Sequence, residues 1–329
     1  MGDEQTAQPD MIAIPVKEFI STTKLQTDIF IKMPSGRFIQ IAHAGDSVSI
    51  ERLTVYESKN VEHLYIRKED YSRYIDKNLS IAGIIVNRND LNGAKKNAIF
   101  AATSQAVLQE MEDLGFTSET FVHAKAITRI TVELCEAKPE FRDLLEALNG
   151  TSNETLAHSV AVSVVSVMLG QACGWTQQAV LEKLALGGLL HDIGMKEIAP
   201  EIGLKPRAKM TFNELREYET HCERGVKILQ SIGSVPDDVI CIVLEHHETA
   251  GGQGFPKRLK SVRQHPLARV VTLANNFCEL TVKNRNLPTV RSAQEAVSYI
   301  QKTQSHFYTR ELMTALEMCF GKASAKKTG

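Results

Sequence analysis

Five histidines and one aspartate recur along consecutive helical segments, and they limit the folds open to this chain more than any other feature. The central element is His191-Asp192, which directly follows the apolar, glycine-containing segment LALGGLL (184–190). The other imidazoles belong to His158 upstream and to His221, His246 and His247 downstream, each on or at the end of a segment with helical periodicity. If these residues bind metal together, helices that are distant in the sequence must pack around one buried site.

The residue types indicate the chemistry of such a site. Neutral imidazole nitrogens and carboxylate oxygens are ligands of iron, manganese and zinc. Several imidazoles with one or two carboxylates and no thiolate favour iron or manganese over a closed tetrahedral zinc site. An aspartate can bridge two ions, and two ions roughly 3.5–4 Å apart can hold a hydroxide and polarise a phosphoryl oxygen. The pattern therefore predicts hydrolysis of a phosphate ester.

Each candidate ligand also has a structural interpretation. A single buried histidine is commonly a hydrogen-bonded core residue, and adjacent His246 and His247 point in different directions on a helix, so one could face solvent. Glu154 and His158 lie four residues apart on one helix face, where the helix dipole alone would favour a glutamate. The metal interpretation is preferred because chance would rarely place the whole set on successive helices. The isolated His43, His63, His123 and His265 are interpreted as structural.

The composition is that of an ordinary globular protein with two domains. The 329 residues suffice for two cores, 43% are hydrophobic and 23% are charged, and the net charge is −1, which gives no strong field for a nucleic-acid polymer or an anionic membrane. The chain start lacks a signal-peptide pattern and the six cysteines form no CxxC pair, so we expect a cytoplasmic protein with reduced thiols. Residues 155–180 carry no charge, but serines and glutamines interrupt them, which favours a buried bundle helix over a membrane span.

Residues 1–90 predict a small mixed α/β domain with a regulatory or sensing role. Segments 28–33 and 38–42 alternate apolar and polar residues around the turn sequence PSGR, which is typical of a β-hairpin. Residues 61–66 are another strand candidate, and residues 69–79 predict a short helix. This region contains no phosphate loop, nucleophile motif or metal cluster, so its sequence is equally compatible with sensing, docking and dimerisation.

After the polar stretch 87–93 the hydrophobic period changes from two to about 3.6, and helices are predicted from there on. Residues 91–150 predict a helical connector, residues 151–321 an all-α metal-binding bundle, and residues 322–329 a disordered tail. Thr211 with Glu214 and Ser292 with Glu295 match capping boxes, and the first is expected to open a continuous helix over 211–232. The expected fold class is α+β, with an N-terminal mixed α/β domain followed by an all-α helical bundle.

The ordered motifs of this bundle resemble the HD-GYP branch of the HD-domain phosphohydrolases. They are HDIG at 191–194, His221, HHE at 246–248, the glycine loop ending in Phe255-Pro256, and the apolar helix 267–277. The resemblance covers about residues 150–290. It implies an HD-type helical fold with a two- or three-metal, often iron, centre, and hydrolysis of the bacterial second messenger cyclic di-GMP to the linear dinucleotide or GMP.

The resemblance also implies roles for individual residues. The implied metal ligands are His158, His191, Asp192, His221, His246 and His247, with Asp192 bridging two ions and thus central to catalysis, and Glu154 matches an extra carboxylate ligand. Two Fe ions are the expected cofactors, with Mn and then Zn as alternatives. Substrate contacts are expected from Gly252, Gln253, Gly254, Phe255, Lys196, Lys283 and Arg285.

Several positions depart from the family pattern. Met195 stands where the family has a phosphate-binding lysine, and Asn275 stands where it has an aspartate ligand, so a neutral amide oxygen replaces a carboxylate there. Phe255 keeps an aromatic ring but lacks the phenol donor of the family's tyrosine. Lys283 and Arg285 only flank the place of the family's basic residues. The sequence thus predicts a divergent member.

Three functional hypotheses follow. The first is a metal-dependent phosphodiesterase that hydrolyses cyclic di-GMP by attack of a metal-bridging hydroxide on phosphorus. The second is a catalytically degenerate protein that binds cyclic di-GMP or a protein partner and signals, which the departures motivate and the full set of metal ligands opposes. The third is an HD hydrolase of another nucleotide. Cyclic di-GMP, signalling proteins and a second copy of the chain are the partners considered, without nucleic-acid polymer or membrane.

Overall fold

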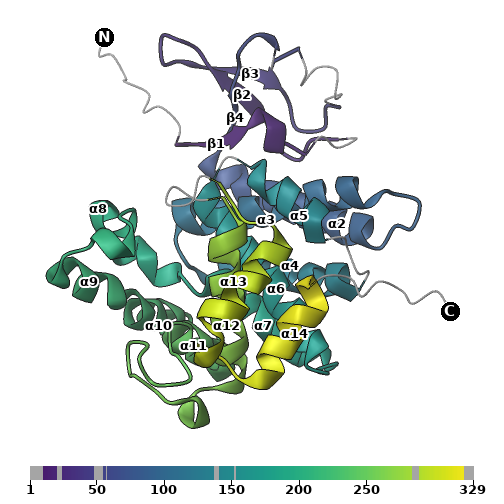
Figure 1. Ribbon diagram of the computed structural model, residues 1–329. Helices are drawn as coiled ribbons and strands as arrows, with labels where there is room; N and C mark the ends of the chain where they lie inside the picture. The colour runs from purple at the N-terminus through teal and green to yellow at the C-terminus, as the bar shows by residue number, and fades with distance from the viewer. Residues whose placement is uncertain are drawn as a thin grey trace. The chain divides into compact units, whose positions relative to one another are not determined.

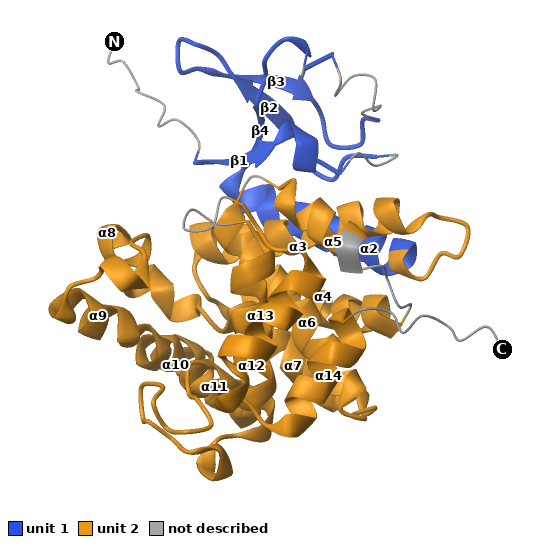
Figure 2. Cartoon of the chain, viewed as in Figure 1, with its two compact units in different colours: residues 1–85 blue, residues 86–329 orange. Residues whose placement is uncertain are grey.

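The computed structural model describes residues 10–20, 24–47, 55–56, 58–136, 141–151, 153–283 and 289–321, and the predicted tail 322–329 lies outside them. The chain divides into two compact units, residues 1–85 and residues 86–329 (Figure 2). The described part of the first unit contains an antiparallel sheet, and the described part of the second is helical. The predicted α+β class is therefore confirmed.

Within its described residues, the first unit is built on a four-stranded antiparallel sheet in the order β1-β4-β2-β3 (Figure 1). The strands are β1 (Met11–Pro15), β2 (Ile29–Lys32), β3 (Phe38–Ala42) and β4 (His63–Arg67), with the 3-10 turns η1 (Val16–Glu18) and η2 (Lys68–Asp70). The predicted hairpin is confirmed, since β2 pairs with β3 and Gly36 takes a φ of 83° in the turn between them. The helix predicted over 69–79 is longer, because apolar residues continue its pattern, and α2 spans Tyr71–Val86.

The second unit packs around α6 (Glu154–Ala172), which contacts α7 (Gln178–Leu190), α12 (Pro266–Thr281), α14 (Arg310–Phe320) and α4 (Ser118–Glu136). Among the described helices, α6 alone is long and apolar enough to cross a membrane, but 72% of its apolar window is buried inside the protein. Val162, Val164 and Val165 of α6 are fully enclosed. Packing within the bundle therefore accounts for its apolar sequence.

Two glycines of α7 let neighbouring helices approach closely. A Cβ on Gly188 would lie 2.8 Å from Ser163 Cα of α6, and a Cβ on Gly187 would lie 2.5 Å from the Ile242 side chain of α11 (Asp237–Glu245). This close packing brings α7, which ends before His191, next to α6, which carries His158, and α11, which precedes His246 and His247.

The remaining helices complete the bundle and correct one expectation. They are α3 (Gly93–Leu114), α5 (Phe141–Asn149), α8 (Pro200–Gly203), α9 (Phe212–Glu219), α10 (His221–Ile232) and α13 (Ala293–Thr303), with the 3-10 turns η3 (Ile193–Glu197), η4 (Arg207–Lys209), η5 (Ser261–Arg263) and η6 (Ser305–Phe307). Both predicted capping boxes are present. The continuous helix predicted over 211–232 is wrong, because it breaks at Thr220, whose hydroxyl donates to the Glu217 carbonyl at 2.6 Å. The break makes His221 the first residue of α10.

Candidate metal centre

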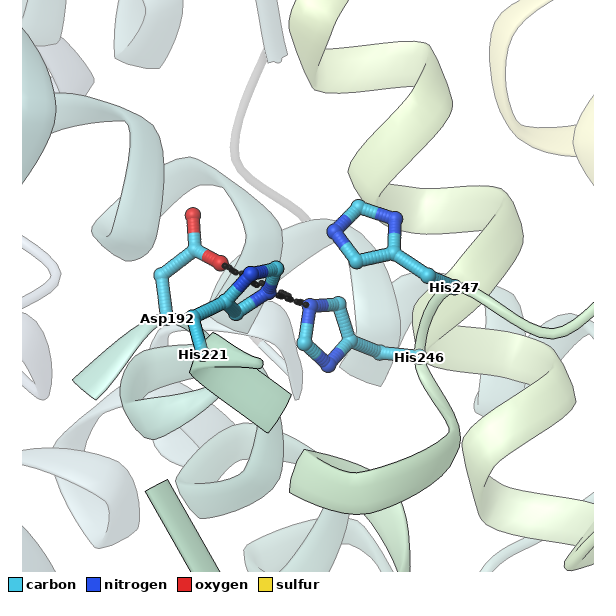
Figure 3. A group of neighbouring side chains, drawn as sticks. All are labelled: Asp192, His221, His246 and His247. Atoms are coloured by element: carbon cyan, nitrogen blue, oxygen red, sulfur yellow. Dashed lines mark hydrogen bonds and ion pairs between the residues drawn. The ribbon is translucent and has the colours of Figure 1, made fainter. Parts of the chain in front are cut away.

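The six residues predicted as metal ligands form two groups that share Asp192. One group contains Asp192, His221, His246 and His247, and the other contains Asp192, His158 and His191. Within each group the candidate ligand atoms all lie within 4.8 Å of one another. Figure 3 shows the first group, in which imidazoles from the start of α10 and the end of α11 meet the carboxylate that follows α7.

The two oxygens of Asp192 face different imidazoles. Its Oδ2 lies 3.3 Å from His191 Nε2, whereas its Oδ1 lies 3.4 Å from His221 Nε2 and 3.5 Å from His246 Nε2. The Nε2 atoms of His221 and His246 are themselves 3.3 Å apart. A carboxylate placed in this way can give one oxygen to each ligand group, as a bridging ligand must.

Backbone carbonyls fix the orientation of three of the rings. Nδ1 of each ring donates to the carbonyl three residues earlier, and the pairs are His191 with Gly188 at 2.8 Å, His221 with Tyr218 at 2.7 Å and His246 with Val243 at 2.9 Å. Since these bonds hold the proton on Nδ1, the lone pair of Nε2 is left for an ion. These rings therefore present Nε2 to the centre of the cluster through their local backbone alone.

Burial favours the neutral imidazoles that metal binding requires at four of the five histidines, whereas at His191 desolvation is outweighed by the Asp192 carboxylate, which raises the pKa. Desolvation lowers the pKa of His158 and of His246 to about 4, and it also lowers the pKa of His221 and His247. Desolvation acts in the opposite direction on Asp192, but the nearby imidazole of His191 holds the pKa of this carboxyl well below its usual range. Neutral imidazoles and an ionised carboxylate are the forms that ligate metal at neutral pH.

Unpaired buried atoms show that the cluster fits an ion. Among the residues that the structure describes, His191 Nε2, His247 Nε2 and Asp192 Oδ1 have no hydrogen-bond partner. A buried polar atom left unpaired costs about 1–3 kcal/mol, and bound cations would satisfy all three. Cys222 Sγ lies 3.4 Å from His221 Nε2, but burial raises the pKa of this thiol, so it remains protonated. The donor set is thus imidazole and carboxylate, which suits iron or manganese.

Asn275 and Glu154, the two ligand candidates besides the five histidines and Asp192, differ in their surroundings. Asn275 Oδ1 accepts a hydrogen bond from His158 Nε2 at 2.9 Å, and this separation is also close to the roughly 3 Å between adjacent ligand atoms of an octahedral ion with bonds of about 2.1 Å. Glu154 belongs to neither ligand group, and its Oε1 lies 3.7 Å from Lys283 Nζ. The extra carboxylate and one of the expected substrate-binding cations therefore contact each other.

The glycine loop packs directly against His247, one of the candidate ligands. A Cβ on Gly254 would lie 2.3 Å from the His247 carbonyl oxygen, so this position requires glycine. The buried Glu248 carboxylate ties the loop down by accepting from the backbone N–H groups of Lys257 and Leu259 at 2.7 and 2.8 Å. Phe255 stacks on the His247 ring with centroids 4.5 Å apart and is only 5% exposed. Its ring therefore supports the candidate ligand His247 and offers little surface for base stacking.

Two other residues predicted to contact substrate, Lys196 and Gln253, form hydrogen bonds within the protein instead. The Lys196 ammonium donates to the Met111 carbonyl and interacts with the carboxylates of Glu112 and Asp113. Gln253 remains within the loop, where its Oε1 accepts from the Thr249 hydroxyl at 3.3 Å, and Gly252 takes a φ of 79° beside it. Arg285 lies outside the described residues.

Three residues near the cluster were not predicted from the sequence. The guanidinium of Arg207 lies 4.8 Å from the Phe255 ring centroid, and the Tyr218 ring lies 5.0 Å from that of His221. Glu279 stands one helical turn after Asn275 on the same face of α12. Glu279 is exposed at the surface of α12, and desolvation together with the charge of Asp192 raises the pKa of its carboxyl to about 7. Glu279 could have been predicted from the sequence, because it follows Asn275 by four residues on a helix. No sequence motif indicates Arg207.

Comparison with known proteins places these residues in a family context. The family model described as HD domain matches residues 141–312. Cyclic di-GMP phosphodiesterase PA4108 of Pseudomonas aeruginosa is 31% identical over 158 residues, 48% of this chain and 37% of that protein. A cyclic di-GMP phosphodiesterase of Thermotoga maritima is 24% identical over 234 residues, 69% of this chain and 60% of that protein. The 3'3'-cGAMP-specific phosphodiesterase 2 of Vibrio cholerae is 28% identical over 175 residues, 53% of this chain and 32% of that protein. The chain thus spans less than two thirds of the length of each of these relatives.

The fold is shared with a solved structure over nearly the whole chain. Bd1817, a HDG"Y"P protein from Bdellovibrio bacteriovorus, superposes with a TM-score of 0.70 at 24% sequence identity. The similarity covers 94% of this chain and 99% of that chain. The arrangement of elements is therefore one already seen in an experimentally solved protein.

Proposed function

Because this chain belongs to the HD domain family, and within it to the HD-GYP proteins, we propose that residues 151–321 form a metal-dependent phosphodiesterase that hydrolyses cyclic di-GMP. The observation that carries the proposal is the pair of ligand groups joined at Asp192. The names of the relatives support the reaction class, since two are cyclic di-GMP phosphodiesterases and one acts on 3'3'-cGAMP.

We further propose two Fe ions as the cofactor, with Mn as the alternative, because the donors are imidazoles and carboxylate without thiolate. When bound, such ions supply positive charge to a phosphoryl oxygen and lower the pKa of water toward neutrality. The cysteines are all free, which supports the proposed cytoplasmic, reducing location.

The chain itself contributes orientation and a low-dielectric environment. Asp192 holds the two ligand groups together, and the carbonyls behind His191, His221 and His246 keep Nε2 directed inward. Full burial of these three rings excludes water from one side of the centre, which strengthens every electrostatic interaction with a phosphate placed there.

The test is cyclic di-GMP turnover by protein purified without oxygen and loaded with Fe(II) or Mn(II). Asp192→Ala should abolish turnover and reduce bound metal, because both ligand groups lose their shared member. Asp238→Ala is the matched control, since Asp238 also contacts an imidazole, with Oδ1 3.0 Å from His265 Nε2, but belongs to neither ligand group. Turnover that survives in Asp192→Ala would refute the proposal.

A second function, binding without hydrolysis, is favoured by the uncharged Met195 and the neutral amide of Asn275. Saturable cyclic di-GMP binding by metal-loaded protein, with the substrate recovered intact, would establish this function instead. Hydrolysis of 3'3'-cGAMP in place of cyclic di-GMP would support the third hypothesis, a phosphodiesterase for another nucleotide.

A further inference from the structure

Two positions expected to contact a substrate phosphate offer no free cation, because Met195 has no charge and the Lys196 ammonium donates to the Met111 carbonyl. Lys283 lies 3.7 Å from Glu154 Oε1, in a partly exposed pair that belongs to neither ligand group. A phosphodiester carries a negative charge and gains from a fixed cation beside the metal centre. Such a cation must therefore come from another described residue near the histidines.

Arg207 is that cation. It lies in η4, between α8 and α9 (Figure 1), and its guanidinium lies 4.8 Å from the centroid of the Phe255 ring. Phe255 in turn stacks on the His247 ring at 4.5 Å, so one aromatic ring separates the guanidinium from a metal ligand. The charge of Arg207 also acts on His221, a member of the cluster, and on Glu279.

Two contacts hold the guanidinium while leaving donors available. Its Nη2 lies 3.2 Å from Glu219 Oε1, and the Phe255 ring supports it through a cation–π interaction. The Arg207 side chain remains 52% exposed. A guanidinium has five N–H donors in a rigid fork, so the bond to Glu219 leaves four, and this fork matches two oxygens of a phosphate.

We propose that Arg207 binds a phosphate of the cyclic dinucleotide beside the metal centre, the role that Met195 cannot take. The inference rests on the proposed function, because it assumes a phosphodiester ligand at the cluster. It assigns a substrate-binding role to a residue outside the motifs that define the site. It also assigns a role to Phe255, whose ring lies between the Arg207 guanidinium and the His247 ring and holds the arginine there.

The experiment compares Arg207→Ala and Arg207→Lys with Lys209→Ala, an exposed basic residue of the same 3-10 turn. For metal-loaded protein, Arg207→Ala should raise KM for cyclic di-GMP by about tenfold to a hundredfold, the factor of a lost charge-assisted hydrogen bond. Arg207→Lys should recover part of this loss, because it restores the charge without the fork. The KM of Arg207→Ala should also depend less steeply on salt, whereas Lys209→Ala should stay within about twofold of the unmodified protein.

The proposed function and this inference fail in different ways. An unchanged KM in Arg207→Ala would overturn the inference and leave the phosphodiesterase intact. Loss of bound metal in Arg207→Ala, without recovery in Arg207→Lys, would assign a structural role and also overturn it. If the unmodified protein shows no turnover, calorimetric binding of cyclic di-GMP replaces KM, and equal affinities with and without Arg207 overturn the inference. Absence of both turnover and binding would overturn both proposals.

Discussion

Replacement of Gly194 by alanine should disrupt the metal centre from outside its ligand set. Gly194 follows Asp192 by two residues in η3, where the chain passes directly against α10. A Cβ at this position would lie 1.9 Å from the His221 carbonyl oxygen and 2.5 Å from the Gly225 nitrogen. Both obstructing atoms belong to backbone, so no side-chain rotation can make room.

The size of the disturbance follows from these distances. Real Cβ atoms essentially never approach another heavy atom closer than 3.0 Å. To lengthen the 1.9 Å contact to this limit, η3 and α10 must separate by about 1.1 Å. These segments carry Asp192 and His221, and metal–ligand distances tolerate only about 0.2 Å. A displacement of about 1 Å typically costs on the order of a hundredfold in rate, and overpacking costs about 1–3 kcal/mol of stability. We expect Gly194→Ala to lose bound metal and at least about a hundredfold in turnover.

The assay measures metal per chain, cyclic di-GMP turnover and thermal unfolding in parallel. Gly203→Ala is the control, because its added Cβ would lie 3.1 Å from the flexible end of Met195 and 4.0 Å from Ile198 Cγ2, with no backbone atom in the way. This control should keep its metal and its rate. If Gly194→Ala binds metal in the same amount and with the same affinity as the unmodified protein, the reasoning from backbone contact is wrong.

Three further outcomes are expected. Asn275→Asp puts a charged oxygen beside His158 and should tighten Fe(II) or Mn(II) binding by about tenfold in chelator competition; unchanged affinity would mean that Asn275 is not a ligand. In metal-free protein, His158 and His246 have a folded pKa of about 4 against 6.5 when unfolded, so the unfolded state binds more protons between these values. The raised pKa of Glu279 acts in the opposite direction, but the pKa values of four histidines are lowered, so the free energy of unfolding should fall as pH drops from 6.5 to 4, and a flat denaturant profile would contradict this expectation. Ser292→Ala removes the N-cap of α13 and should cost about 1 kcal/mol in denaturant unfolding, and any accompanying loss of metal would contradict a purely local role.

The sequence was informative wherever a residue type and a helical period agreed. Imidazoles and a carboxylate at the ends of apolar helices were enough to predict that His158, Asp192 and His221 would meet, and the structure brings all six predicted ligands into two groups. The hairpin and both capping boxes were also predictable, because turn and cap chemistry depends only on neighbouring residues.

The missed features depend on tertiary neighbours. Arg207 and Lys283 are long, flexible side chains, and their partners Phe255 and Glu154 lie far away in the sequence. No local sequence pattern predicts which distant residue such a side chain contacts. The helix break at Thr220 was missed because the hydrophobic period continues across it, whereas the hydroxyl bond that accompanies it is a single local contact.

The hydrogen bonds from Nδ1 to the carbonyl three residues earlier have a consequence for metal choice. Since His191, His221 and His246 are oriented by their own turns of backbone, their geometry is established when the protein folds and does not wait for an ion. Exchange of one ion for another then requires little rearrangement of these rings. Affinities of such sites follow the general order of the divalent metals, so the ion in the cell is determined largely by which metal is supplied. Growth conditions that change iron and manganese availability should therefore change the occupant of this centre without changing the fold around it.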